Sequence, residues 1–227
     1  MTEHWFHPVP LPERGLERLR RYAGKWIDLN WDVEVHGEDH VPGTGPVILA
    51  ANHLGWLDGP LLFLKAPRPA HALVKSDLFV GRVGRLLNMA AQIPITRLGA
   101  DVTSLRKAAQ ALAAGQVVVI FPEGRRGPGD LRRIKGGVAW LALVTGAPVV
   151  PVSIFGSRLP GADRESRPPK GSPIQVVYGE PLTLDAVAWP RTTQALTKAR
   201  KTIHRHLKQQ LATARELTGA TLPGPLP

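Results

Sequence analysis

The apolar residues of this 227-residue chain follow two alternating patterns. Short continuous runs rich in Val, Ile and Ala are typical of strands buried on both faces of a sheet. Apolar residues that recur every three or four positions are typical of helices. The predicted strands are residues 33–37, 46–51, 71–75, 93–96, 116–121, 148–155 and 174–178. The predicted helices are residues 11–30, 76–87, 101–114, 134–145 and 192–217. This alternation predicts an α/β fold, with a single mixed, largely parallel sheet covered by helices.

The domain organisation follows from where this alternation starts and stops. We expect one domain over residues 33–217, preceded by a helical segment over residues 1–32. Residues 218–227 are rich in Pro and Gly and carry no apolar periodicity, so we expect a disordered tail. Within the domain, Ser76 is a candidate N-cap for the helix predicted after it.

The first predicted helix is amphipathic and basic. Its apolar residues at helical spacing are Leu16, Leu19, Ala23, Trp26 and Ile27. Its basic residues are Arg14, Arg18, Arg20, Arg21 and Lys25. Two interpretations fit this pattern. One is a helix that lies in a membrane interface, and the other is a first helix packed on the domain with a solvated basic face.

The formal net charge of +11 indicates a polyanionic partner, either nucleic acid or an anionic membrane surface. No apolar run approaches the roughly eighteen residues that a membrane-spanning helix needs. Residues 1–12 lack the apolar core of a signal peptide, and the absence of cysteine fits a reducing compartment. We therefore expect a peripheral protein on the cytoplasmic side of the cell membrane, bound to its anionic surface.

A histidine and a carboxylate stand close together after the predicted strand 46–51. His53 and Asp58 are five residues apart, and Gly55 and Gly59 would allow a turn that brings them together. A carboxylate that holds one ring nitrogen fixes the tautomer, so that the other nitrogen can accept a proton. The pair could therefore be a general base with its orienting group, or a structural contact that caps a helix.

A second polar segment follows the predicted strand 116–121. Residues 121–137 are dense in arginine and glycine, and arginine forks and close backbone N–H groups suit phosphate. The alternative is a solvated basic loop in which Glu123 pairs with an arginine. Nucleic acid is a weaker candidate ligand, because aromatic residues make up only 6% of the chain and none interleaves with this loop. We therefore expect no nucleic-acid partner.

His53, Arg97 and Glu123 each follow a predicted strand, and the carboxyl ends of parallel strands gather at one edge of a sheet. At this point the chain resembles the glycerolipid acyltransferases, in particular the bacterial 1-acylglycerol-3-phosphate acyltransferases. Four blocks match in order. They are Asn52-His53 through Asp58, Ile93-Pro94-Ile95-Thr96-Arg97, Phe121-Pro122-Glu123-Gly124 with Arg126, and Val150-Pro151-Val152. The resemblance spans residues 33–178 and implies that His53 is the catalytic base and Asp58 its partner.

The resemblance also implies the substrates. The acyl donor would be acyl-CoA or acyl-carrier protein, and the acceptor lysophosphatidate, which becomes phosphatidate in phospholipid biosynthesis. No cofactor and no metal are expected. The residues expected to bind substrate are Arg97, Glu123, Gly124, Arg125, Arg126 and Lys135. Other acceptors remain open, namely glycerol-3-phosphate, another lysophospholipid or a glycolipid, and so does a non-catalytic protein that binds anionic lipid.

The chain departs from the family pattern at three positions. Arg125 stands where the third block has threonine, Gly127 stands where serine follows the arginine, and Gln92 stands near the glycine that usually opens the second block. His53 and Asp58 match, so acyl transfer is still expected. The added arginine favours an acceptor with a free phosphate monoester over a zwitterionic lysolipid.

Overall fold

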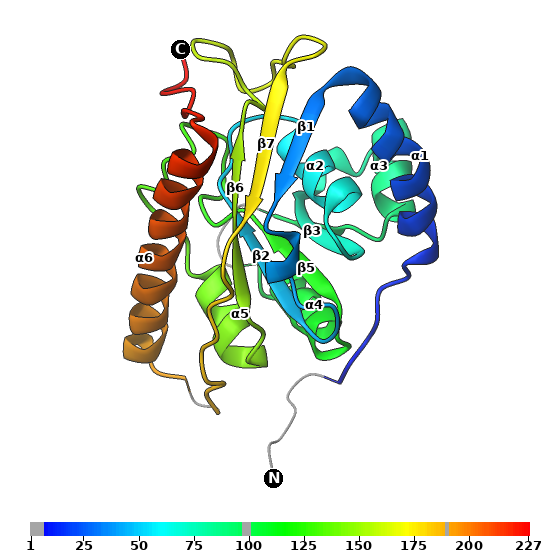
Figure 1. The fold of residues 1–227 in the computed structure, drawn as a ribbon. Helices are drawn as coiled ribbons and strands as arrows, with labels where there is room; N and C mark the ends of the chain where they lie inside the picture. Colours follow the sequence, from blue (N-terminus) through cyan, green and yellow to red (C-terminus); the bar gives the residue numbers. More distant parts are fainter. Residues whose placement is uncertain (1–6, 97–100, 189–190) are drawn as a thin grey trace.

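The computed structural model describes residues 7–96, 101–188 and 191–227, and it forms a seven-stranded sheet between helices (Figure 1). The strands are β1 (Asp32–His36), β2 (Val47–Ala51), β3 (Ala70–Lys75), β4 (Ile93–Ile95), β5 (Val117–Ile120), β6 (Val149–Phe155) and β7 (Pro173–Tyr178). The helices are α1 (Arg14–Asn30), α2 (Asp58–Lys65), α3 (Gly81–Met89), α4 (Val102–Ala113), α5 (Gly137–Thr145) and α6 (Thr193–Thr218), with short 3₁₀ helices η1 (Glu38–His40) and η2 (Ser76–Leu78). The predicted fold class is confirmed.

The strand order is β1-β7-β6-β2-β5-β3-β4, and β6 and β7 are the one antiparallel pair among these neighbours. The strands from β2 to β6 therefore all run in one direction, and β1 and β7 run in the other. We call the edge at which β2 to β6 end the carboxyl edge. Because α1 leads into β1, the C-terminal end of α1 lies at this same edge.

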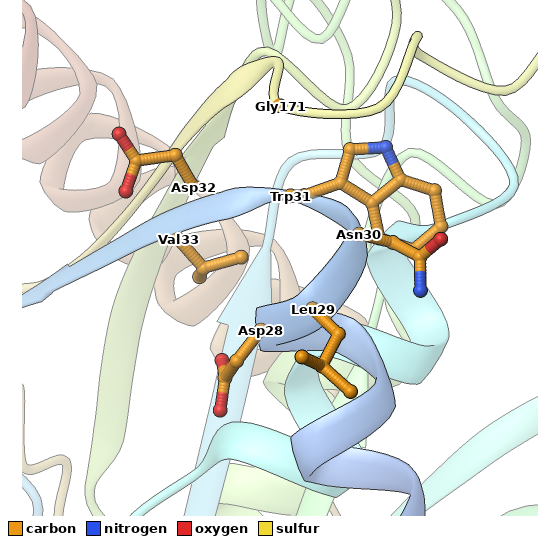
Figure 2. A pocket seen from close by; sticks show the side chains of 7 residues that line it. All are labelled: Asp28, Leu29, Asn30, Trp31, Asp32, Val33 and Gly171. Carbon is orange, nitrogen blue, oxygen red and sulfur yellow. The ribbon is translucent and has the colours of Figure 1, made fainter.

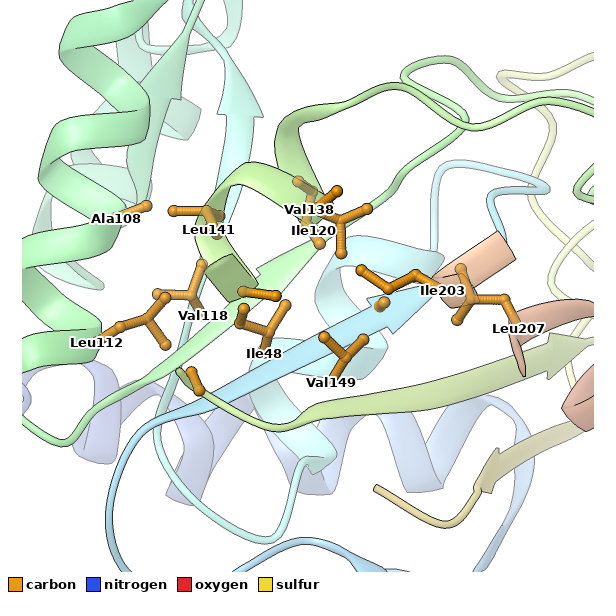
Figure 3. Close-up of a cluster of buried hydrophobic side chains, with 14 of the residues drawn as sticks. Ile48, Ala108, Leu112, Val118, Ile120, Val138, Leu141, Val149, Ile203 and Leu207 are labelled. Atoms are coloured by element: carbon orange, nitrogen blue, oxygen red, sulfur yellow. The ribbon is translucent and has the colours of Figure 1, made fainter. Parts of the chain in front are cut away.

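Apolar side chains of the central strands alternate between two cores, since successive residues of a strand point to opposite faces. Ile48, Val118 and Val149 pack against α4, α5 and α6, as Figure 3 shows. Their neighbours Leu49 and Val119 belong to the core on the other face, which α1 and α2 cover. Both faces are covered, which explains why the central strands read as continuous apolar runs.

Helix α1 packs on the domain and is also amphipathic. Leu16 and Ile27 are fully buried, whereas Tyr22, Trp26 and Leu29 are exposed. Helix α1 is therefore packed on the domain, as one of the two interpretations had it. Its outer side still exposes apolar side chains. Across the described ranges, no helix is both long and apolar enough to cross a membrane.

The prediction of one helix over residues 76–87 is wrong, because the segment divides into η2 and α3. The chain is extended at Val80, and Gly81 has a φ of +58°, which a right-handed helix does not allow. Ser76 makes no capping hydrogen bond. The short helix α2, which begins at Asp58, was not among the predicted elements.

The tail also differs from its expected disorder. It has no helix or strand after Thr218, but Leu222 packs against the core. The carbonyl of Gly224 accepts a hydrogen bond of 2.7 Å from Arg158.

Candidate active site

The side chain of Asn52 extends the pairing of β2 with β6 one residue beyond the end of β2. Its amide donates to the carbonyl of Ile154 at 3.0 Å, and its oxygen accepts from the N–H of Ile154 at 2.7 Å. Both groups are buried, so these bonds satisfy backbone that would otherwise be left unpaired. Asn52 thereby fixes the position at which the chain leaves β2 and enters the turn that carries His53.

His53 and Asp58 meet across that turn. The ring Nδ1 of His53 lies 2.7 Å from Oδ2 of Asp58, and the same oxygen accepts the backbone N–H groups of Leu54 and Gly55 at 2.6 and 2.9 Å. Asp58 is fully buried at the first position of α2, where the helix dipole favours a negative charge. The carboxylate therefore closes the turn and orients the imidazole, so the structural and the catalytic interpretations hold together.

The geometry of the pair fixes the ring tautomer. A carboxylate only accepts hydrogen bonds, so Nδ1 carries the proton and Nε2 presents a lone pair. Within the described residues, Nε2 has no hydrogen-bond partner, and 11% of the side chain is exposed. The ring of Phe121 stacks on the imidazole, with centroids 4.0 Å apart and planes at 19°. His53 is thus held on one face and at Nδ1, with Nε2 available as a base.

Glu123 supports the backbone of His53. Its Oε1 accepts the N–H of His53 at 3.0 Å, and none of the described arginines forms a salt bridge with it. Burial raises the pKa of Glu123 to about 7, and the nearby carboxylates of Asp130 and Asp58 add to the rise, whereas the His53 N–H and the charge of Arg125 oppose it. The alternative in which Glu123 pairs with an arginine does not hold among the described residues, and its role in binding substrate stays a prediction.

The basic loop is fastened to the turn of His53. The N–H of Gly127 donates to the carbonyl of His53 at 2.9 Å, and the N–H of Lys135 donates to the carbonyl of Pro122 at 2.8 Å. Gly129 has a φ of +68°, and a Cβ there would lie 2.1 Å from Cδ2 of Leu54. These contacts place the loop directly beside the catalytic pair.

The cations expected to bind phosphate differ in their surroundings. Arg126 forms an ion pair of 2.5 Å with Glu165 and is largely buried. Arg125 is exposed, and its side chain and that of Lys135 make no hydrogen bond or salt bridge to any residue that the structure describes. Gly124 has a φ of +72° and lies against the Lys135 side chain. Arg97 lies outside the described residues.

Two residues at the end of β6 contribute to the site and were missed by sequence reasoning. The hydroxyl of Ser157 donates to Oδ1 of Asp58, so both carboxylate oxygens are occupied. Because Ser157 is fully buried and its proton is engaged, it is unsuited to act as a nucleophile. The signal available in the sequence was a Ser-Arg pair directly after a buried strand, next to the last of the four matching blocks.

Arg158 follows, and it is 1% exposed. Its guanidinium donates to four carbonyls, those of Leu54, Gly127, Ala162 and Gly224, at 3.2, 3.1, 2.9 and 2.7 Å. Leu54 belongs to the turn of His53 and Gly127 to the basic loop. Arg158 therefore ties together the two segments that carry the candidate chemistry, and it joins the tail to them.

A surface pocket of about 400 Å³ lies elsewhere, where α1 turns into β1 (Figure 2). It is lined by Asp28, Leu29, Asn30, Trp31, Asp32, Val33 and Gly171. None of the residues predicted to be catalytic or to bind substrate lines it. The candidate catalytic residues lie instead at the ends of β2, β5 and β6, where His53 adjoins a loop whose cations Arg125 and Lys135 have no ion-pair partner among the described residues.

Comparison with known proteins agrees with this geometry. The sequence pattern of the acyltransferase family matches residues 32–155. A 1-acyl-sn-glycerol-3-phosphate acyltransferase of Bacillus subtilis is 25% identical over 81% of this chain and 90% of its own length. An uncharacterized protein of Mycobacterium leprae is 31% identical, and the match covers 88% of this chain and 64% of that protein.

A solved structure shares the fold. The crystal structure of a 1-acyl-sn-glycerophosphate acyltransferase from Thermotoga maritima matches with a TM-score of 0.66 and 24% identity, over 88% of this chain and 79% of that one. Because the family pattern covers more than half of the chain and includes His53, Asp58 and the loop at Glu123, the chain belongs to the acyltransferase family.

Proposed function

We propose that the protein transfers a fatty acyl group from the thioester of acyl-CoA or acyl-carrier protein to the free hydroxyl of 1-acylglycerol-3-phosphate. The product would be phosphatidate. The observation that carries this proposal is the hydrogen-bonded His53–Asp58 pair, fastened to a loop with the unpaired cations Arg125 and Lys135. The Bacillus subtilis relative, which is named for this acceptor, supports the choice.

The chemistry uses the free nitrogen of His53. Nε2 takes the proton of the acceptor hydroxyl while the hydroxyl oxygen attacks the thioester carbonyl. A new C–O bond forms, the C–S bond breaks, and the ring returns the proton to the departing thiolate, so that the products are an ester and a free thiol. Asp58 stabilises the positive ring between these steps. Because the hydroxyl of Ser157 is engaged by Asp58, direct attack is favoured over a covalent acyl-enzyme.

The basic loop supplies the site for the phosphate. We assign Arg125 and Lys135 to the phosphate monoester, because neither forms a salt bridge with a carboxylate of the described residues. Arg126 would join them only by exchanging Glu165 for the phosphate. Arg97 remains an assignment from the family resemblance. Gly124 leaves room for the Lys135 side chain, and Glu123 acts through the backbone of His53.

The central experiment measures free thiol released from acyl-CoA in the presence of lysophosphatidate. We expect His53→Ala to lose activity by at least about 10²-fold, which is the low end of a general-base contribution. His206→Ala on α6 is the matched control and should keep full activity. Release that needs no acceptor, or that survives His53→Ala, would contradict the mechanism. No release with any acceptor would favour the non-catalytic lipid-binding alternative.

Acylation rates with a panel of acceptors show which head group the enzyme prefers. Lysophosphatidate, glycerol-3-phosphate and lysophosphatidylcholine present a monoester on a lipid, a monoester without a lipid, and a zwitterion. We expect lysophosphatidate to be acylated fastest. Arg125→Thr, which restores the family residue, should raise the KM for lysophosphatidate more than it changes kcat. Faster acylation of lysophosphatidylcholine would refute the assignment.

The location of the substrate calls for contact with a membrane. We propose that the protein binds the anionic surface peripherally, with the exposed cations of α1 against it. Reversing the charges of Arg14, Arg18 and Arg21 to Glu should weaken co-sedimentation with anionic vesicles. Unchanged binding would remove α1 from this role.

A further inference from the structure

The exposed apolar side chains of this protein are concentrated in two elements. Twelve large hydrophobic residues are exposed within the described ranges, and five of them lie between Leu78 and Met89 in η2 and α3. These five are Leu78, Val80, Val83, Leu86 and Met89. Three more, Tyr22, Trp26 and Leu29, lie on α1. We call these eight residues the α1–α3 face. A cluster of this kind on a soluble surface marks a contact with another molecule or a membrane.

The local packing of α3 explains why it exposes so much apolar surface. Only Gly84 and Leu87 are buried in this nine-residue helix, and Gly84 is pressed against the backbone of Phe79. The helix therefore rests on a narrow stripe, and Val83 and Leu86 project from the opposite side. Val80, which directly precedes the helix and has an extended backbone, is 70% exposed. Within the part of the chain that the structure describes, no neighbouring element covers these side chains.

Helices α1 and α3 lie on the same side of the molecule in Figure 1, where they overlap in the view. At one end they touch, since a Cβ on Gly15 of α1 would lie 2.1 Å from the carbonyl oxygen of Met89. At the other end both reach the carboxyl edge. There β3 ends and η2 begins, and there α1 runs into β1. The turn of His53 follows β2, so the candidate active site lies at this same edge of the sheet.

The charges around the face are mostly positive, and its exposed acidic residues are Glu17 and Asp28 on α1 and Asp77 in η2, of which Asp28 and Asp77 are paired with lysines. Arg82 and Arg85 are exposed on α3, which contains no acidic residue. The exposed cations on α1 are Arg14, Arg18, Arg21 and Lys25. A second copy of the chain docked on this face would bring like charges together, whereas an anionic bilayer offers both hydrocarbon and negative head groups. The composition of the face therefore selects the bilayer as its occupant.

We propose that η2 and α3 form a second membrane-contacting element, which inserts Leu78, Val80, Val83, Leu86 and Met89 into an anionic bilayer beside α1. This arrangement turns the carboxyl edge toward the lipid, so that an acceptor could reach His53 without leaving the interface. The proposal depends on the proposed function only for the identity of that acceptor. Membrane contact itself is tested without any turnover.

The test is co-sedimentation with vesicles of phosphatidylglycerol and phosphatidylcholine, compared with phosphatidylcholine alone. The variant carries Val80→Ser, Val83→Gln and Leu86→Gln, and the matched control carries Val9→Gln, Val102→Gln and Leu217→Gln, which change equally exposed residues elsewhere. We expect the α3 variant to partition at least tenfold more weakly into anionic vesicles and the control to bind like the wild type. Circular dichroism verifies that both are folded. Wild-type binding by the α3 variant, or equal loss by the control, would overturn the proposal.

A second measurement separates this proposal from the proposed function. Acylation of a short-chain, monomeric lysophosphatidate should be the same for the wild type and the α3 variant, while acylation of vesicle-embedded acceptor should fall for the variant alone. If the wild type acylates neither acceptor, the proposed function fails and the vesicle result still decides the face. Sedimentation velocity tests the competing occupant. A wild-type dimer that the α3 variant abolishes, with vesicle binding unchanged, would show that a second copy covers the face.

Discussion

Replacing Asp58 by Asn tests the charge of the catalytic pair while preserving its shape. The asparagine oxygen can take the place of Oδ2 and accept from Nδ1 of His53 and from the N–H groups of Leu54 and Gly55. The amide nitrogen then faces the hydroxyl of Ser157, which can rotate to accept its proton. The ring and the two backbone N–H groups thus keep an acceptor and the ring keeps its tautomer, whereas the Ser157 proton loses the acceptor that it has in the wild type. What disappears is the negative charge beside the imidazole.

The size of the effect follows from the geometry. Nδ1 and Oδ2 are 2.7 Å apart. The centres of the two charges, when the ring is protonated, are then roughly 4 Å apart, and at an effective dielectric constant of about 20 their attraction is about 4 kcal/mol. A loss of that size in the transition state corresponds to about 10³-fold in kcat. Weaker hydrogen bonds from the two N–H groups should also cost about 2 kcal/mol of stability, or roughly 4–8 °C in Tm.

The assay is thiol release at saturating acceptor, together with thermal unfolding of the same preparation. We expect kcat to fall by about 10³-fold with little change in the KM for the acceptor, because Asp58 does not touch the phosphate site. A folded Asp58→Asn enzyme with kcat within threefold of the wild type would refute the role of Asp58 as the charge that stabilises protonated His53.

Three further predictions concern the surroundings of the pair. Burial raises the pKa of Glu123 to about 7 from an ordinary value of 4.5. Between these two pH values the folded protein keeps a proton that the unfolded chain releases. The free energy of unfolding should therefore fall as pH rises through this window, by a few kcal/mol at most. Urea unfolding at several pH values should show this slope in the wild type and a flatter one in Glu123→Gln. Arg158→Met leaves four carbonyls without their buried donor and should lower the free energy of unfolding by at least about 3 kcal/mol. A variant as stable as the wild type in thermal unfolding would show that these hydrogen bonds do not hold the segments together. Gly129→Ala should reduce kcat more than tenfold by displacing Leu54, while Gly161→Ala, which has a similar φ of +71° but open space, should change stability alone; equal kinetic effects would contradict this explanation.

Local patterns in the sequence were sufficient for part of this site. The five-residue spacing of His53 and Asp58 with intervening Gly55 indicated a turn that joins them, and the structure contains that turn. The strands were visible as apolar runs, because both faces of the sheet are covered. Helix 76–87 was misread because the composition of the segment suits a helix, whereas the extended backbone at Val80 and the positive φ of Gly81 interrupt it.

The remaining contacts depend on which strands are neighbours, and local patterns carry little of that information. Ser157 and Arg158 reach Asp58 and Leu54 because β6 lies beside β2, although about a hundred residues separate the two segments. The stacking of Phe121 on His53 similarly requires β5 on the other side of β2. The ion pair of Arg126 with Glu165 joins two loops and could not be distinguished from several other arginine–carboxylate pairs in the sequence.

The pairing of β1 with β7 has a consequence for biosynthesis. Asp32 aligns with Pro173, so the strand that follows α1 finds its partner only after some 140 further residues have left the ribosome. Contacts of such large sequence separation form late in folding. Throughout that interval α1 is a basic amphipathic segment on an unfinished domain. Together with the proposed contact of α1 with lipid, this order of synthesis predicts that a nascent chain adsorbs to anionic vesicles more strongly than the finished protein.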